Sequence, residues 1–146
     1  MKRMIVAVLA LLALSPRAVA APLDWKAAPG PAIEGAADIE HATWSVAREP
    51  GGPFDRIEVH RYRAAGKAAS ATVLYLPGTN MNGEVAVPDE DHNLWIFLAR
   101  RGVEVYALDY RTRFASASTD AAALASMKTW TTEVFVEDIK AAAALA

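Results

Sequence analysis

The sequence predicts an α/β fold that begins with an antiparallel hairpin and continues into a parallel strand, helix, strand unit. Two alternating apolar and polar segments, residues 43–48 and 56–63, flank the run Glu49-Pro50-Gly51-Gly52-Pro53. Alternation on both sides of a Gly- and Pro-rich turn is typical of a half-exposed hairpin. Two nearly continuous apolar runs, residues 71–76 and 103–108, indicate central strands that are covered on both faces.

The first twenty residues have the pattern of a secretory signal peptide. Lys2 and Arg3 precede an apolar run from Met4 to Leu14, and Ala18-Val19-Ala20 supplies small residues for cleavage. The alternative is a membrane anchor, but the apolar run is only about half of the roughly 20 residues that span a bilayer. We therefore predict cleavage after Ala20 and export to a bacterial periplasm or the medium, without a stable membrane anchor.

Charge and cysteine content narrow the possible partners. The formal net charge of −2 becomes −5 when the three cations Lys2, Arg3 and Arg17 leave with the signal peptide. A negative domain lacks the electrostatic attraction on which nucleic-acid binding depends. The sequence has no cysteine, so it offers neither disulfides nor thiolate metal ligands.

The segments around the two central strands have distinct patterns. Residues 21–42 combine proline, glycine and small residues without a period of 2 or 3.6, which predicts an irregular lead-in. Residues 93–101 carry apolar side chains at helical spacing, and Gly102 follows as a left-handed cap. A right-handed crossover through this helix makes the strands at 71–76 and 103–108 parallel.

The C-terminal part predicts two further helices. Residues 119–127 form a short alanine-rich segment, and Thr131 or Thr132 can cap a longer helix that continues to Ala146. Glu133 near its beginning suits the helix dipole. Neither a glycine cap nor a proline follows this helix, and we therefore expect the chain to be a fragment of a longer protein.

The loop after the first central strand is the main candidate for chemistry. Gly78 and Gly83 have the glycine spacing of a phosphate-binding loop, but Glu84 and Val85 stand where that loop needs Lys and Ser or Thr. An acid at the lysine position repels phosphate. The sequence also lacks the G-x-G-x-x-G fingerprint, and we predict no cofactor.

Taken together, these segments resemble the N-terminal half of an α/β-hydrolase over residues 43–146. Leu76-Pro77-Gly78-Thr79 stands at the place of the oxyanion loop, and Asp109-Tyr110-Arg111 at the Asp-x-Arg that ends the fourth strand of the family. The resemblance implies that the Thr79 backbone N–H helps to hold an oxyanion. The Asn80 side-chain amide is the second candidate donor.

The resemblance stops short of a catalytic centre. No G-x-S-x-G elbow occurs in the sequence, although the family places its nucleophile there, followed by the acid and the histidine. We expect these residues beyond Ala146, in a serine esterase or acyl hydrolase acting on a small ester or acyl compound, and we expect the chain by itself to be inactive. The alternatives are a non-catalytic binding or interaction protein on the same scaffold, or a decayed gene product.

The remaining polar residues predict no metal site. His41, His60 and His92 stand in contexts that do not suggest convergence. The run from Asp89 to His92 could bind calcium or zinc, but it lacks the ligand spacing of a known loop, and we interpret it as a solvated helix entrance with Asp91 as the cap. Arg111 is expected to pair with Asp109 or with an acid elsewhere.

Overall fold

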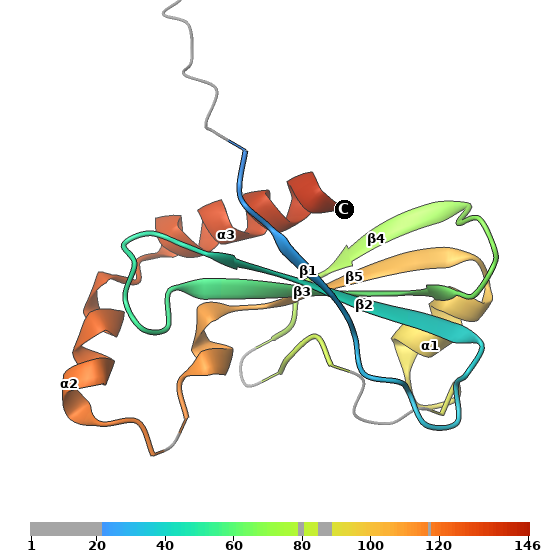
Figure 1. Ribbon diagram of the computed structural model, residues 1–146, viewed down its shortest axis with the longest axis horizontal. Helices are drawn as coiled ribbons and strands as arrows, with labels where there is room; N and C mark the ends of the chain where they lie inside the picture. The colour runs from blue at the N-terminus through green and yellow to red at the C-terminus, as the bar shows by residue number, and fades with distance from the viewer. Residues whose placement is uncertain (1–21, 79–80, 85–88, 117) are drawn as a thin grey trace, which may run out of the picture.

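Figure 1 shows the computed structural model, which describes residues 22–78, 81–84, 89–116 and 118–146. The strands are β1 (Lys26–Pro29), β2 (Ile39–Ala47), β3 (Arg56–Ala64), β4 (Ala71–Tyr75) and β5 (Val103–Asp109). The α-helices are α1 (Leu94–Arg100), α2 (Ala121–Leu124) and α3 (Thr132–Leu145), and the 3-10 helices are η1 (Arg111–Phe114) and η2 (Ala125–Thr129). The predicted signal peptide lies outside the described residues.

The strands form one mixed sheet in the order β1-β2-β3-β5-β4. The predicted hairpin is confirmed, because β2 pairs with β3 in antiparallel register from Ile39 opposite Ala64 to Ala47 opposite Arg56. The predicted parallel pair is also confirmed, with Ala71 of β4 opposite Val103 of β5. Since β5 also pairs antiparallel with β3, it lies between the hairpin and β4.

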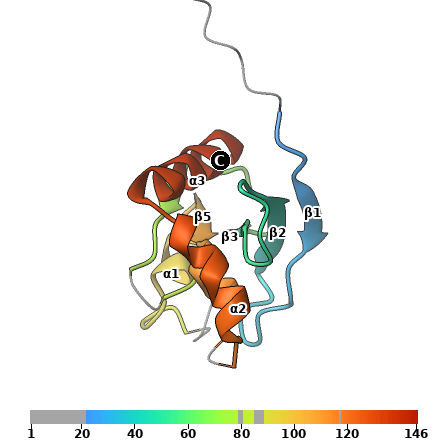
Figure 2. The same cartoon turned by 90° about the vertical axis from the view of Figure 1, so that its left-hand side faces the viewer.

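Helices α1 and α3 cover opposite faces of this sheet (Figures 1 and 2). The register puts alternate residues of β3 on opposite faces. Tyr62 therefore packs with Ile96 and Ala99 of α1, in a cluster that includes Val105 and Ala107. Val59 packs with Ala142 of α3, in a second cluster that includes Ile57, Leu108 and Ala141. The sheet is thus the middle layer between two apolar cores.

The lead-in at 21–42 is more regular than we predicted. Its described part contains strand β1, which pairs antiparallel with β2 from Lys26 opposite Ser45 to Pro29 opposite Ala42. β2 also begins at Ile39 rather than at residue 43. All four residues of β1 are exposed, so they have no alternation that would mark a strand. Proline is acceptable because β1 is the edge of the sheet.

Strand β4 is more exposed than the predicted central strand. Its first three residues are exposed and its last two are half-buried, with Val73 at 38% exposure. β4 is the last strand in the described sheet, and α1 packs against β3 and β5. β5 occupies the central place that we predicted for both strands, and its last five residues are buried.

Helix α1 has the predicted end and a different beginning. Gly102 follows it with φ of 80°, a left-handed conformation that glycine adopts without a Cβ clash. Asn93, rather than Asp91, is the N-cap, because its side-chain oxygen accepts from the N–H groups of Trp95 and Ile96. Asn93 is directly adjacent to the first turn, so its oxygen reaches these free donors.

The C-terminal helices agree with the prediction in order but not in length. The alanine-rich segment divides into α2, capped by the side chain of Asp120, and the 3-10 helix η2. Helix α3 begins after Thr131 as predicted, although Thr131 makes no side-chain cap bond. Asp138 of α3 is fully buried, which makes it the one charged residue of this helix in the core.

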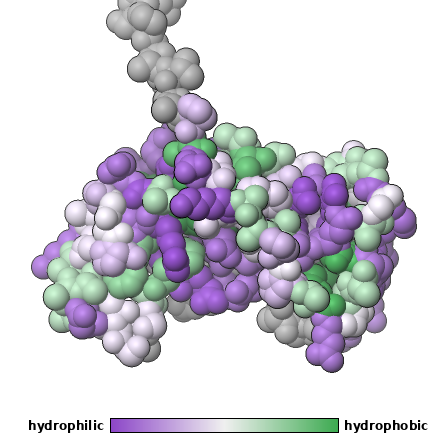
Figure 3. Space-filling view, viewed as in Figure 1, coloured by the Kyte–Doolittle hydropathy of each residue, from purple (hydrophilic) through white to green (hydrophobic). Residues whose placement is uncertain are grey.

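None of the helices in the described part of the chain is both long and apolar enough to cross a membrane. On the face in Figure 3, hydrophobic residues are dispersed among hydrophilic ones.

Candidate functional site: a polar cluster beneath the loop after β4

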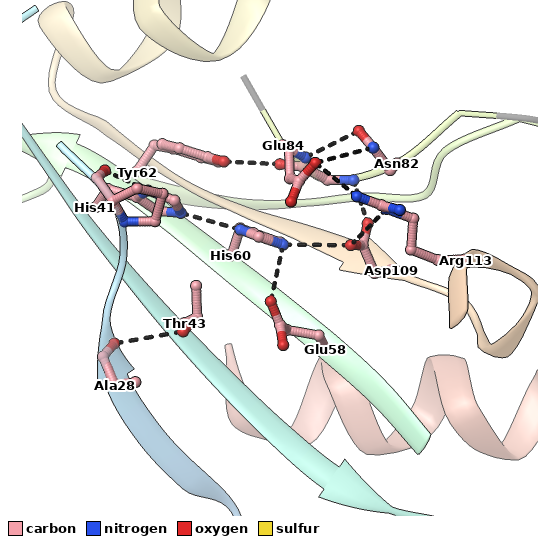
Figure 4. Close-up of polar contacts among 12 residues, drawn as sticks. Ala28, His41, Thr43, Glu58, His60, Tyr62, Asn82, Glu84, Asp109 and Arg113 are labelled. Atoms are coloured by element: carbon pink, nitrogen blue, oxygen red, sulfur yellow. Dashed lines mark hydrogen bonds and ion pairs between the residues drawn. The ribbon is translucent and has the colours of Figure 1, made fainter. Parts of the chain in front are cut away.

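The loop between β4 and α1 is the region in which the sequence predicts oxyanion donors. Thr79 and Asn80 lie outside the described residues, so the structure does not test their role. The described part from Met81 to Glu84 lies next to the carboxyl end of β5 (Figure 4). Buried side chains of β3 and β5 hold this part of the loop.

Gly83 is fastened through both of its backbone polar groups. Its N–H donates to Oδ1 of Asp109, and its carbonyl oxygen accepts from the Tyr62 hydroxyl at 2.8 Å. Both hydrogen bonds are buried. Buried backbone groups need such partners because an unpaired one carries a desolvation penalty. The sheet therefore specifies the position of this loop through two side chains.

Only glycine fits at this position. A Cβ on Gly83 would lie 2.7 Å from the carbonyl oxygen of Ala107 and 2.9 Å from Cδ2 of His60. Real Cβ atoms do not approach backbone oxygen so closely. Gly83, whose spacing from Gly78 resembles that of a phosphate-binding loop, therefore allows the loop to lie close against the sheet.

His41 and His60 converge, contrary to our prediction. Nε2 of His41 lies 3.0 Å from Nδ1 of His60, and Nδ1 of His41 lies 3.0 Å from the carbonyl oxygen of Pro31. A carbonyl oxygen only accepts, so His41 Nδ1 carries a proton. Burial lowers the pKa of His41. The hydrogen bond to Pro31 acts in the opposite direction, but its effect is smaller, so the pKa is lowered overall. The other ring nitrogen of His41, Nε2, is the one that shares a hydrogen bond with Nδ1 of His60.

His60 connects this pair to two carboxylates. Its Nε2 lies 3.3 Å from Oδ2 of Asp109 and 3.4 Å from Oε1 of Glu58. His60 is 2% exposed and Asp109 is 3% exposed, whereas Glu58 is half-buried. These three residues could together hold a metal ion, because one ligand atom from each lies within 4.8 Å of the others.

Part of this cluster could have been found from the sequence. Glu58, His60 and Tyr62 alternate along a predicted strand, so they share one face of it. His41 lies before the predicted start of the first strand at residue 43, and the register that sets it opposite Tyr62 is not a local property of the sequence. Asp109 was predicted as part of a family motif and as a possible partner of Arg111, not as a neighbour of His60.

Arg113 and Glu84 link the same loop to η1. A guanidinium nitrogen of Arg113 donates to the Glu84 carboxylate at 2.9 Å, and Nε of Arg113 lies 3.9 Å from Oδ2 of Asp109. Both side chains of this pair are more than 40% exposed. The ion pair contributes less than the buried hydrogen bonds at Gly83, because water screens it.

A second polar cluster lies between the hairpin turn, η1 and α3. Arg111 donates to Asp138 at 2.6 Å and to Asp55 at 2.5 Å, and Arg48 donates to Asp138 at 2.8 Å. Arg111, Asp55 and Asp138 are buried. Trp130 also donates to Asp55, at 2.8 Å. The predicted pairing of Arg111 with an acid elsewhere is confirmed.

This second cluster is structural in character. Burial by itself would raise the pKa of Asp55, but hydrogen bonds from Gly52, Trp130 and Arg111 outweigh it, so the pKa is lowered. Arg111 of η1 contacts Glu49 and Asp55 of the hairpin turn on one side and Asp138 of α3 on the other. We interpret the cluster as the attachment of α3 to the sheet.

The run from Asp89 to His92 does not form a buried site. His92 Nδ1 lies 2.9 Å from Asp89 at an exposed position, and Glu90 accepts from Arg100 and Arg101. These contacts agree with a solvated helix entrance. The structure separates His92 from the cluster around His60, since His92 pairs with the loop before α1.

Comparison with known proteins supports the fold and leaves the activity open. None of the family models and curated proteins compared with the chain matches it. Among solved structures, a protein described as a "putative lipase" from Sulfolobus solfataricus is similar, with a TM-score of 0.71 and 29% sequence identity. The match covers 80% of this chain and 36% of that chain. The chain therefore spans about a third of the length of that protein, and its five-stranded mixed sheet with helices is similar to a lipase or hydrolase fold.

Proposed function

We propose that this chain is the N-terminal part of an exported serine esterase or acyl hydrolase with an α/β-hydrolase-like fold. Its substrate is a small molecule with an ester or related acyl bond. The similarity to a protein described as a lipase supports the scaffold. The observation that supports a catalytic role for the loop after β4 is the double attachment of Gly83 to Asp109 and Tyr62.

In the proposed chemistry, the loop between β4 and α1 stabilises the negative charge of the oxyanion. A serine beyond Ala146 attacks the substrate carbonyl, a histidine takes and returns its proton, and an acid orients the histidine. The oxyanion that forms is held by the backbone N–H of Thr79, with the Asn80 side chain as the second candidate donor. Gly83 is not such a donor, because its N–H already donates to Asp109.

Preorganisation is the reason why the loop attachment matters. Donors that are in place before the charge develops need no rearrangement during the reaction, and loss of one costs about 10²–10³ in kcat. Gly83 stands only a few residues after Thr79 in the sequence. Fixing Gly83 against the sheet limits the positions that the donor segment can take.

The first test is to read the coding sequence past the codon for Ala146. An open frame that encodes a strand, a G-x-S-x-G elbow and a later acid and histidine supports the proposal. A stop codon directly after Ala146 contradicts it and favours a non-catalytic binding protein or a decayed gene.

The second test is hydrolysis of short p-nitrophenyl esters by the complete gene product. Thr79→Pro removes the proposed N–H donor, and Thr79→Ala is the matched control that retains it. We expect kcat to fall about 10²–10³-fold in Thr79→Pro, with little change in Thr79→Ala. Equal kcat in the two variants would assign the oxyanion donor elsewhere, and Asn80→Ala then tests the second candidate.

A further inference from the structure

We propose that Glu58, His60 and Asp109 form a binding site for a divalent metal ion, for which Zn²⁺ has the matching ligand chemistry. The ligand atoms are Oε1 of Glu58, Nε2 of His60 and Oδ2 of Asp109. Figure 4 shows the three side chains meeting at His60, beside the attached loop. This inference does not depend on the proposed hydrolase activity.

The contact between His60 and Asp109 is a long hydrogen bond, and the spacing of the ligand atoms also fits a metal ion. Nε2 of His60 lies 3.3 Å from Asp109 and 3.4 Å from Glu58. Charge-assisted N–H to carboxylate hydrogen bonds are about 2.7–2.9 Å long. Two ligands held by Zn²⁺ at about 2.0–2.1 Å in a tetrahedron lie roughly 3.3–3.4 Å apart. The observed separations therefore correspond to two edges of such a tetrahedron.

The contact on the other side of His60 directs its Nε2 at the carboxylates. Nδ1 of His60 lies 3.0 Å from Nε2 of His41, whose Nδ1 lies 3.0 Å from the carbonyl oxygen of Pro31. Nε2 of His60 is therefore the ring nitrogen that faces the two carboxylate oxygens. Metal ions bind histidine through a ring nitrogen of this kind, and the cluster presents it together with two carboxylates.

Each of the two buried ligands has a partner that orients it. Asp109 uses Oδ1 for the N–H of Gly83 and presents Oδ2 to the cluster. His60 uses Nδ1 for His41 and presents Nε2. Metal-binding histidines and carboxylates characteristically have such outer partners, which fix the ligand orientation. The chain thus provides the support of the site as well as its ligands.

The local charge also matches a divalent cation. Glu84 and Arg113 form an ion pair with each other at 2.9 Å, and Nε of Arg113 also lies 3.9 Å from Oδ2 of Asp109. The side chain of Arg113 is 43% exposed, so water screens its charge. Glu58 and Asp109 contribute the two carboxylates of the cluster. The side chain of Glu58 is 30% exposed, which gives an ion a route from solvent and a position for water as the fourth ligand.

The test is metal binding by the complete gene product after removal of metals with a chelator. We expect calorimetric titration with Zn²⁺ to show one equivalent bound, and the thermal midpoint to rise in its presence, because a ligand that binds the folded state stabilises it. Co²⁺ in place of Zn²⁺ should give the visible absorption of a four-coordinate ion.

Variants locate the site. Glu58→Gln removes the carboxylate of the half-buried ligand and keeps the shape of the side chain. We expect it to weaken Zn²⁺ binding at least about tenfold, because even the loss of a residue that only orients a ligand has an effect of this size. His60→Gln should abolish binding of the first equivalent. His92→Gln is the matched control, because His92 also contacts a carboxylate, at an exposed position, and should bind Zn²⁺ as the unaltered protein does.

Two results would overturn the proposal. One is the absence of Zn²⁺ binding by the metal-free complete gene product. The other is equal Zn²⁺ affinity in the unaltered protein and Glu58→Gln, which would place the bound ion elsewhere.

Discussion

Asp109, the last residue of β5, accepts a hydrogen bond from the backbone N–H of Gly83 in the loop after β4. The two residues are 26 positions apart in the sequence, and their contact is buried. A strand end thereby determines the position of the loop on which the proposed chemistry depends. The neighbouring strand contributes Tyr62, which holds the carbonyl group of the same glycine.

Gly83→Ala should destabilise the protein. The added Cβ would lie 2.7 Å from a backbone oxygen, so the loop has to move away from the sheet. We expect a loss of about 1–3 kcal/mol in the free energy of unfolding, measured by urea denaturation. Gly78→Ala is the control, because among the described residues its Cβ would meet Met81 Sδ alone, at 3.7 Å. An equal loss in both variants would contradict the close approach at Gly83.

Tyr62→Phe should also lower stability while it preserves packing. The variant keeps the ring in the core and removes the hydroxyl that donates to Gly83, which leaves a buried carbonyl oxygen without this donor. We expect a loss of about 1–3 kcal/mol. Tyr75→Phe removes a hydroxyl whose contact with Met81 Sδ is 4.0 Å long and exposed, and denaturation should show little change for it.

Asp138→Asn should weaken the attachment of α3 far more than a neighbouring change on the same helix. Asp138 is fully buried and accepts from Arg48 and Arg111. Removing one partner of a buried ion pair typically costs about 3–5 kcal/mol. Glu137→Gln removes an exposed ion pair with Lys140 and should leave the unfolding curve nearly unchanged. Similar curves for the two variants would show that the buried cluster is not important for stability.

Asp55 should make stability depend on pH in the acid range. Its pKa is lowered in the folded protein, so the folded state binds the proton less readily than the unfolded state does. The stabilisation is present above the unfolded pKa of about 3.9 and is lost as the pH falls through the lower folded value.

The measurement is the free energy of unfolding between pH 7 and pH 3 for the unaltered protein and for Asp55→Asn. We expect the difference between the two to be largest at neutral pH and to shrink below about pH 4. Asp91→Asn, at an exposed position, serves as the comparison. A difference that is constant with pH would contradict the lowered pKa.

Export predicts a specific mass. If residues 1–20 are a signal peptide, the protein recovered from the periplasm or medium of a bacterial host should begin at Ala21, as measured by intact-mass spectrometry. Replacing Ala18 and Ala20 by bulky residues should retain the longer form. Recovery of the unprocessed chain in the cytoplasm would contradict the proposed export.

The local sequence pattern determined the order and type of the main elements. Alternation over residues 43–48 and 56–63 predicted β2 and β3, and the apolar runs predicted β4 and β5. These predictions succeeded because side-chain period and turn chemistry are properties of neighbouring residues. The end of α1 at Gly102 could also be predicted from neighbouring residues, because the left-handed φ at this position favours glycine.

The tertiary structure alone decided which residues meet. β1 exists because its backbone pairs with β2, although its exposed residues carry no pattern. β4 is exposed at the end of the described sheet, beyond β5. The cluster of His41, His60 and Asp109 depends on strand register across 19 and 49 positions of the sequence. Register is set by the packing of whole strands and helices, and no local window of the sequence contains that information.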